Sequence, residues 1–160
     1  MSDRVPIPTS VWNFLRYDPE SGKLYWVVGR RCHVSAGDEA GSLTRDGYLK
    51  VKVEGRVYLA HRLAWFAVYG DQPHILDHID GNPANNRVEN LRPATQRQNG
   101  KNVAAVGASY DPKRGKWMAR ICVDYKHINL GRYATREDAV RVAQAARREH
   151  FGEFARVVQL

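Results

Sequence analysis

An aspartate and a histidine stand side by side at positions 77 and 78, in a segment whose residue types suit metal-assisted chemistry. Neighbouring strand residues point to opposite faces, so Asp77 could bind a cation while His78 faces a water molecule. Asn99, 22 positions after Asp77, could offer a neutral carbonyl oxygen to the same cation. Oxygen ligands without a thiolate favour Mg²⁺ or Mn²⁺ over Zn²⁺. An ion held by one carboxylate keeps positive charge, which would attract a phosphodiester and stabilise charge developing on it.

The elements that must position these residues follow from turn and strand signals. After an apolar pair at 75–76, residues 77–86 are rich in Asp, Asn, Gly and Pro and cannot continue a helix or a central strand. Residues 90–94 predict a short edge strand, because the proline among them cannot donate to a ladder. Thr95 can cap a helix that reaches about residue 102 and contains Asn99. The predicted order is therefore strand, loop, strand, helix.

Upstream of this segment, alternating residues around Glu54-Gly55 predict a β-hairpin over residues 48–60. A buried helix is predicted from His61 to Tyr69, ended by Gly70, with core positions at Leu63, Ala64, Ala67 and Val68. A short helix over 9–15, capped by Thr9, and a strand over 23–28 are predicted before it.

Composition limits the class of protein. A chain of 160 residues with 43% hydrophobic and 26% charged residues forms one ordinary domain or two small ones. No apolar run is long enough to span a bilayer, and the N-terminal residues lack the apolar core of a secretory signal, so we expect a cytoplasmic protein without a membrane partner. Cys32 and Cys122 belong to no paired motif and are expected to be free thiols.

The positive charge is concentrated toward the C-terminus. Residues 1–100 hold 13 basic and 11 acidic side chains, whereas residues 101–160 hold 12 and 6. Such an asymmetry favours a polyanionic partner. A membrane surface would need an apolar helix face opposite the basic one, and the arginine-bearing helix of this region uses its apolar stripe for packing, so nucleic acid is the better candidate.

The C-terminal region predicts a second small domain of three strands and one helix, over residues 103–160, after a first domain over 1–102. Turns at 110–115 and 124–126 bound alternating strands at 116–123 and 127–133, and Thr135 can cap a helix. On the first of these strands, Trp117, Ala119, Ile121 and Val123 share one face, which should pack on the helix stripe Ala139, Val142, Ala143 and Ala146. The opposite, polar face suits a DNA major groove.

The spaced run His61-Arg62-Leu63, Asp77-His78-Ile79-Asp80-Gly81-Asn82, Asn85 to Arg92, Thr95 and Asn99 resembles the HNH endonuclease family, in particular its phage and intron-encoded homing-type branch. The resemblance covers roughly residues 45–102 and implies a ββα-metal fold. It also implies that His78 is the general base, that Asp77 and Asn99 bind one divalent metal, and that Asn90 braces the loop through backbone hydrogen bonds. His61 belongs to the same motif; from its sequence alone, a structural role at its helix start is preferred.

Residues 107–155 resemble the APETALA-type domain of plant ethylene-response factors, through Gly115-Lys116-Trp117, Leu130-Gly131, Tyr133-Ala134-Thr135 and Glu137-Asp138-Ala139. The resemblance implies that the DNA-facing side chains are Lys116, Arg120, His127, Asn129 and Arg132. A basic, merely solvated sheet is the alternative.

These patterns together predict an α+β protein that hydrolyses DNA phosphodiester bonds with Mg²⁺, or with Mn²⁺, as cofactor. Double-stranded DNA is the expected partner of a monomer or homodimer, and a single site of this kind would nick one strand per engagement. One alternative is a non-catalytic DNA-binding protein that uses the HNH unit as a scaffold. Another is a ribonuclease-type toxin, which the major-groove sheet disfavours. A zinc pair formed by His74 and His78 is opposed by Pro73 and the strand prediction.

Overall fold

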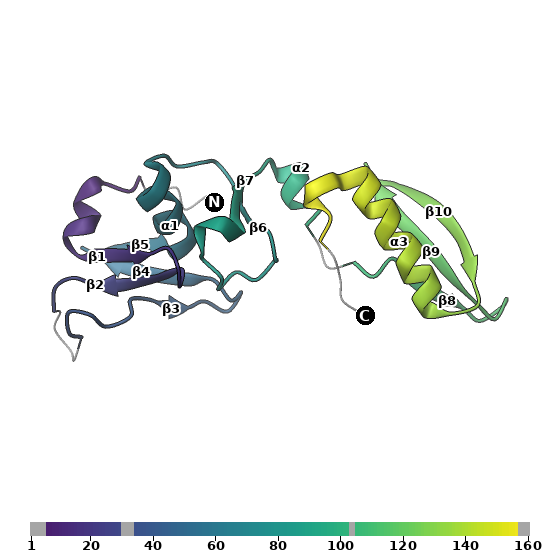
Figure 1. Ribbon diagram of the computed structural model, residues 1–160, viewed down its shortest axis with the longest axis horizontal. Coiled ribbons are helices and arrows are strands. Elements are labelled where there is room, and N and C mark those ends of the chain that lie inside the picture. The colour runs from purple at the N-terminus through teal and green to yellow at the C-terminus, as the bar shows by residue number, and fades with distance from the viewer. Residues whose placement is uncertain (1–5, 30–33, 103–104, 157–160) are drawn as a thin grey trace. The chain divides into compact units, whose positions relative to one another are not determined.

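The computed structural model describes residues 6–29, 34–102 and 105–156, and its elements follow one another in the order shown in Figure 1. Packing divides the chain into two compact units, Met1–Thr95 and Gln96–Leu160. The division falls before the short helix α2 (Gln96–Asn99), whereas the sequence suggested a boundary after it. Cys32 and the first residues of the expected junction, 103–104, lie outside the described residues.

The described part of the first unit contains three small antiparallel arrangements of strands. Strands β1 (Leu15–Asp18) and β2 (Lys23–Trp26) form one ribbon, and β3 (Ser42–Leu43), β4 (Leu49–Val53) and β5 (Arg56–Leu59) form a sheet in that order. The third is the ribbon of β6 (Leu76–His78) and β7 (Leu91–Pro93).

The helix predicted over 9–15 is only partly right. The 3-10 helix η1 (Thr9–Asn13) ends at Asn13, and Leu15 already pairs with Trp26. The side chains of Leu15 and Trp26 are both buried.

The predicted hairpin and its helix are confirmed. Glu54 and Gly55 adopt φ values of 47° and 81°, the left-handed conformation of a two-residue hairpin turn between β4 and β5. Helix α1 (Ala60–Tyr69) ends at Gly70, as predicted. Its core face is shorter than expected, because Ala67 and Val68 are exposed and the buried side chains all lie in the first two turns. The spacing of hydrophobic residues indicates which face of the helix is apolar. It does not indicate how much of that face is covered by other elements.

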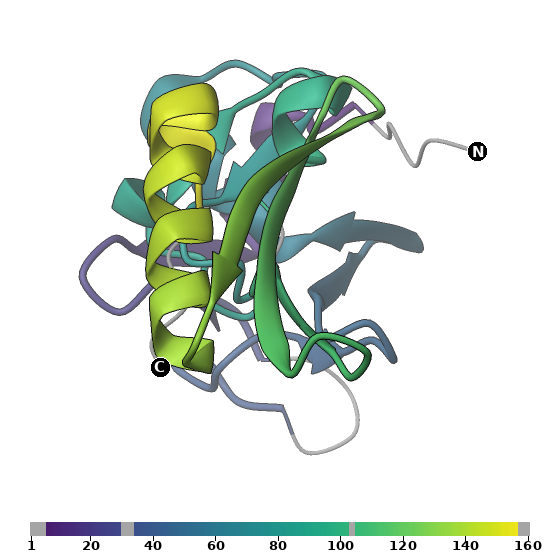
Figure 2. The ribbon, with the colours of Figure 1, turned by 90° about the vertical axis from the view of Figure 1, so that its right-hand side faces the viewer.

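The second unit is a three-stranded antiparallel sheet in the order β10-β9-β8, covered on one face by a helix (Figure 2). Its elements are β8 (Ala108–Asp111), β9 (Lys116–Val123), β10 (Lys126–Tyr133) and α3 (Arg136–Phe151). The predicted cap is present, since Thr135 Oγ1 accepts a hydrogen bond from the Asp138 amide at 3.2 Å. Strand β8 includes Tyr110 and Asp111, which the sequence assigned to a turn.

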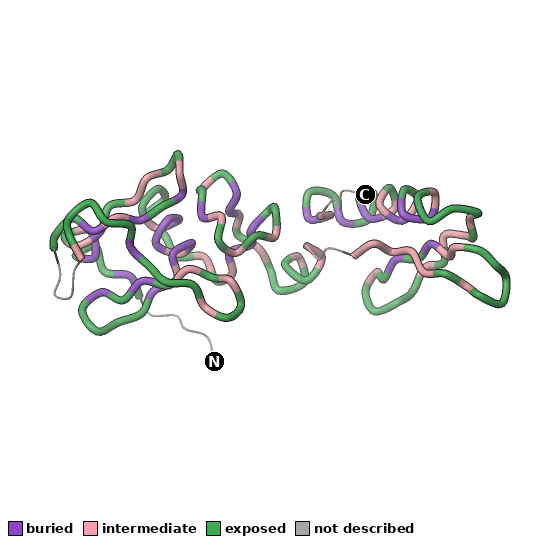
Figure 3. Tube along the Cα trace, turned by 90° about the horizontal axis from the view of Figure 1, so that it is seen from below, coloured by how far each residue is buried: buried purple, intermediate pink, exposed green. Residues whose placement is uncertain are grey.

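Alternation along β9 sorts its side chains as predicted. Ala119 and Ile121 are buried against Ala139 and Ala143 of α3, with Trp117 and Val123 partly buried beside them. The buried side of α3 faces the sheet in Figure 3. The fold is therefore α+β, a strand–loop–strand–helix order followed by a small sheet packed on one helix. Within the described ranges, no helix combines the length and apolarity that crossing a membrane requires.

Candidate active site and nucleic-acid interface

The β6–β7 ribbon positions the aspartate–histidine pair. Asp77 and His78 end strand β6, whose three residues are all buried, and they pair with Arg92 and Leu91 of β7. Leu76 and Leu91 pack with residues of α1 in one apolar cluster, which anchors the ribbon. The polar loop that follows then begins directly beyond His78.

Asp77 is held by an ion pair with Arg92, its partner across the β6–β7 ribbon. The guanidinium of Arg92 lies with Nη2 2.7 Å and Nε 2.9 Å from Asp77 Oδ2. Both side chains are mostly withdrawn from solvent, with exposures of 11% for Arg92 and 5% for Asp77. A buried carboxylate needs such a partner, because an isolated charge away from water is strongly unfavourable.

The ring of His78 is oriented by Asn86, a nearly fully buried residue. His78 Nε2 lies 3.3 Å from Asn86 Oδ1, while Asn86 Nδ2 donates to the carbonyl of Ala84 at 3.2 Å. Because the amide nitrogen is turned toward Ala84, the oxygen faces the imidazole, and Nε2 of a neutral His78 must carry the proton. The lone pair of the ring is then on Nδ1. Burial lowers the pKa of His78, against the raising effects of Asn86, Asp80 and Asp77.

His61 and Tyr48 enclose the other side of this histidine. The ring centroids of His61 and His78 lie 5.1 Å apart in an edge-on contact, and Tyr48 lies 5.6 Å and 6.0 Å from the two rings. Burial, and to a lesser extent the charges of His78 and Arg62, lowers the pKa of His61 to about 3. His61 is therefore neutral near pH 7, at the start of α1, and restricts where the His78 ring can turn.

Asn90 closes the loop between β6 and β7. Its Oδ1 accepts from the Asp80 amide at 3.0 Å, and its Nδ2 donates to Asp80 Oδ1 and to the Asn85 carbonyl, each at 2.9 Å. Burial raises the pKa of Asp80, but hydrogen bonds from Asn82, Asn85 and Asn90 outweigh it and lower the pKa overall. The loop is thus tied at both ends by one buried asparagine.

The β1–β2 ribbon supports the same loop from outside. Tyr17 Oη donates to the Asn86 carbonyl at 2.9 Å and accepts from the Val88 amide at 3.0 Å. Gly22, in the β1–β2 turn, lies so close that a Cβ there would be 2.5 Å from the Arg87 nitrogen. The backbone around Asn86 is therefore held by a ribbon that lies far from it in the sequence.

Asn99, the third expected site residue, is an exposed residue on α2, which belongs to the second unit, whereas Asp77 and His78 belong to the first. Across the described ranges, no group of three His, Cys, Asp or Glu side chains could hold a metal ion. Taken individually, the Asp77 carboxylate and the Asn99 side-chain amide are oxygen donors of the kind that hard cations prefer.

The five expected DNA-facing residues all lie exposed on the sheet of the second unit: Lys116, Arg120, His127, Asn129 and Arg132. Directly opposite residues of an antiparallel pair share a face, and Asn129 pairs with Arg120 while Arg132 pairs with Met118. If side chains alternated strictly along β10, Arg132 would lie on the face of the sheet that packs against the helix. The register shifts between Asn129 and Gly131, so Arg132 lies on the polar face instead. Arg132 also forms an ion pair with β8, because its Nε lies 3.6 Å from Asp111 Oδ2.

Two residues that shape the site, Arg92 and Asn86, do not stand out from the sequence alone. Arg92 was treated as part of a motif, although an arginine facing an aspartate across the two predicted strands was a usable signal for an ion pair. Asn86 lies in the loop predicted from the Asp-, Asn-, Gly- and Pro-rich run, and no local pattern separates it from Asn85, whose side chain donates to Asp80 instead. Only burial and the fold distinguish these two asparagines.

Comparison with known proteins agrees with this geometry. Residues 58–101 match the HNH endonuclease family model, so the segment from the end of β5 through α2 is an HNH endonuclease domain. The chain belongs to the same family as Protein 3.8 of Escherichia phage T7, with which it is 32% identical over 106 residues, or 60% of this chain and 87% of that protein. No solved structure matches it significantly. Nuclease activity is therefore the general class that the domain supports.

Proposed function

We propose that this chain is a metal-dependent DNA endonuclease in which His78 activates the attacking water. The HNH match over residues 58–101 supports the class of reaction. The observation that carries the assignment is the buried His78 ring, with Nε2 facing Asn86 Oδ1 at 3.3 Å, immediately after Asp77. A general base needs a fixed ring and one tautomer with its lone pair toward the reacting water, and an amide acceptor on Nε2 supplies both.

In the proposed reaction, Nδ1 of His78 accepts a proton from water as the water oxygen bonds to phosphorus. The bond from phosphorus to the leaving oxygen then breaks, and that oxygen takes a proton from solvent. Asp77 and Asn99 would hold one divalent ion, Mg²⁺ or Mn²⁺, which when bound supplies positive charge that stabilises the developing negative charge. Asn90 keeps the loop after His78 closed, and His61 limits rotation of the catalytic ring.

The second unit would bind double-stranded DNA through the polar face of its sheet. Exposed Lys116, Arg120 and His127, with Asn129 and Arg132, offer both phosphate contacts and donors for base edges. Since one such nuclease site cuts one strand per engagement, we propose a site-preferring nicking or homing-type activity.

The test is incubation of the full chain with supercoiled plasmid, with Mg²⁺ or with EDTA. We expect nicked circles only with the metal. His78→Ala should lower the single-turnover rate by roughly 10²–10⁴-fold, while His74→Ala, an exposed histidine just before the same strand, should stay within about twofold of wild type. Full activity of the His78→Ala protein would refute the assigned base.

The Asp77–Arg92 ion pair favours a second candidate, a DNA-binding protein with a non-catalytic HNH unit. A carboxylate already neutralised by arginine can serve stability alone. In that case the same plasmid assay would show no cleavage with either Mg²⁺ or Mn²⁺, while DNA binding would persist.

A further inference from the structure

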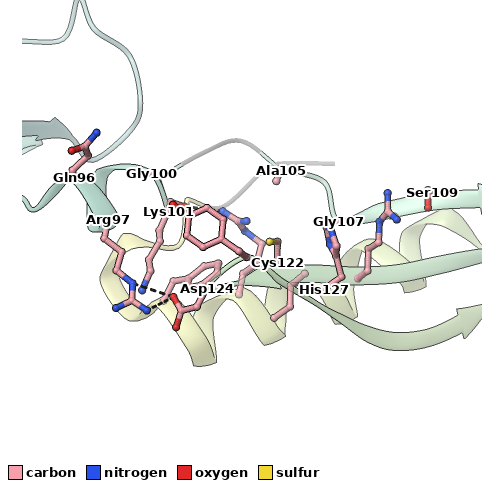
Figure 4. Close-up of a pocket in the computed structure, with 16 residues that line it drawn as sticks. Gln96, Arg97, Gly100, Lys101, Ala105, Gly107, Ser109, Cys122, Asp124 and His127 are labelled. Carbon is pink, nitrogen blue, oxygen red and sulfur yellow. Dashed lines mark hydrogen bonds and ion pairs between the residues drawn. The ribbon is translucent and has the colours of Figure 1, made fainter.

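A cavity of about 970 Å³ opens within the second unit, between α2, the turn after β9 and the C-terminal end of α3 (Figure 4). Five basic residues line it, against one acidic residue, Asp124; the basic ones are Arg97, Lys101, Arg120, His127 and Arg147. Its walls also include the apolar side chains of Ile121 and Phe151. A site with positive charge and an apolar wall suits a ligand that is partly anionic and partly flat and apolar.

The positive groups at its inner end are held in place. The ammonium of Lys101 lies 5.1 Å from the centre of the Phe151 ring, and the guanidinium of Arg147 lies 5.3 Å from it. Arg147 is buried and donates from Nη2 to the Lys101 carbonyl at 2.9 Å. Arg147 thus fixes the backbone of Lys101, whose ammonium lies over the Phe151 ring at the cavity wall.

A tyrosine in an unusual conformation stands at the rim. Asp124 and Tyr125 form the two-residue turn between β9 and β10 with φ values of 50° and 65°, where Asn and Gly are the usual residues. A bulky side chain at such a φ is strained by about 1 kcal/mol or more, and the Tyr125 side chain is fully exposed, at 101%. Nothing in the packing of this turn explains an aromatic residue there.

The cavity is continuous with the face proposed to bind DNA, because Arg120 and His127 belong to both. Its volume matches that of small-molecule sites and is far too small to admit a double helix. A single nucleotide that has left the helix would fit, with its phosphate near the basic groups. Aromatic side chains bind such nucleotides by stacking on the base.

We propose that this cavity binds one unpaired nucleotide of a DNA strand, with Tyr125 stacking on the base and Lys101 contacting the phosphate. The substrate class implied is DNA with a gap or a single-stranded tail beside a duplex. This inference rests on the DNA binding proposed above and adds that the bound DNA contains an unpaired nucleotide. It does not depend on whether the protein cleaves DNA.

The experiment measures binding by fluorescence anisotropy in EDTA, with the full chain and three labelled DNAs: a blunt duplex, the same duplex with a three-nucleotide tail, and the single strand. Tyr125→Gly removes the ring and relieves the strained turn, so the variant should fold at least as well as wild type. We expect it to bind tailed and single-stranded DNA about 5- to 100-fold more weakly and the blunt duplex within about twofold. Tyr125→Phe should retain binding of the tailed DNA.

For single-stranded DNA, the logarithm of the binding constant falls linearly with the logarithm of the salt concentration, with a slope of about −0.7 for each phosphate contact. Lys101→Gln removes one such contact and should therefore make this slope shallower by about 0.7. Equal binding of tailed DNA by wild type and Tyr125→Gly would overturn the proposal, as would an equal loss for tailed and blunt DNA. Competition by free deoxyadenosine monophosphate at the concentration of the tailed DNA would assign the cavity to a free nucleotide and overturn the strand proposal. If plasmid cleavage fails while these differences hold, only the proposed catalysis is refuted.

Discussion

Arg92 and Asp77 face each other across the β6–β7 ribbon, with Arg92 Nη2 2.7 Å from Asp77 Oδ2 in a largely buried ion pair. The fold needs the arginine to neutralise the buried carboxylate, whereas a bound divalent ion would compete with it for the same oxygens. If Asp77 is the metal ligand proposed above, the charge on Arg92 would therefore affect both the stability of the ribbon and the affinity of Asp77 for a cation.

Removing that charge should separate the two effects. Without metal, Arg92→Gln leaves a buried carboxylate without its cation and should lower the free energy of unfolding by about 3–5 kcal/mol. The same change should tighten Mn²⁺ binding severalfold, measured by titration with detection of free Mn²⁺ by electron paramagnetic resonance. Arg87→Gln, an exposed arginine of the neighbouring loop, serves as control. Weaker Mn²⁺ binding by Arg92→Gln would mean that Arg92 supports the ligand geometry instead of competing.

Gly22 should matter more for the loop between β6 and β7 than its distance in sequence suggests. Gly22 and Gly55 both have positive φ, at 73° and 81°, but only at Gly22 would a Cβ meet backbone, that of Arg87 and Asn86. Gly55→Ala should lower unfolding free energy by about 1 kcal/mol from backbone strain alone, and Gly22→Ala by about 1–3 kcal/mol more. Urea unfolding gives the difference, and Gly22→Ala should also slow plasmid nicking. Equal effects of the two substitutions would show that the close contact is absent.

The buried His61 should make the first unit sensitive to acid. Burial lowers the pKa of His61 to about 3 in the folded state, from 6.5 when unfolded, so the unfolded chain binds more protons between these values. Stability is then fully present above about pH 6.5 and falls by about 1.4 kcal/mol per pH unit below it. His61→Gln should flatten this part of the profile, measured by urea unfolding at pH 7 and pH 5 with tryptophan fluorescence.

An unaltered slope in the His61→Gln protein would locate the acid sensitivity elsewhere.

Thr135 should stabilise the second unit through its helix cap. Thr135→Ala removes the acceptor for the Asp138 amide and should lower unfolding free energy by about 1 kcal/mol. Thr135→Ser keeps the hydroxyl and should lose only a fraction of that amount. Thermal unfolding followed by circular dichroism measures both, and an alanine variant as stable as the serine variant would contradict the cap.

Features that depend on near neighbours could be predicted from the sequence. The Glu54-Gly55 turn, the Thr135 cap and the alternation along β9 each require only residues a few positions apart, and all three are present. Asp77 and His78 were placed at a strand end for the same reason, because the Asp-, Asn- and Gly-rich loop begins beside them.

Relationships between distant residues were decided by the tertiary structure. The partner of His78 is Asn86 and not Asn85 because only Asn86 is turned into the core, and the pKa of His61 falls because α1 buries it against His78. Arg132 reaches the polar face through an irregularity in β10 that alternation cannot foresee. Burial and register depend on how whole helices and strands pack against one another. A local pattern of residues does not specify which distant element will pack on it.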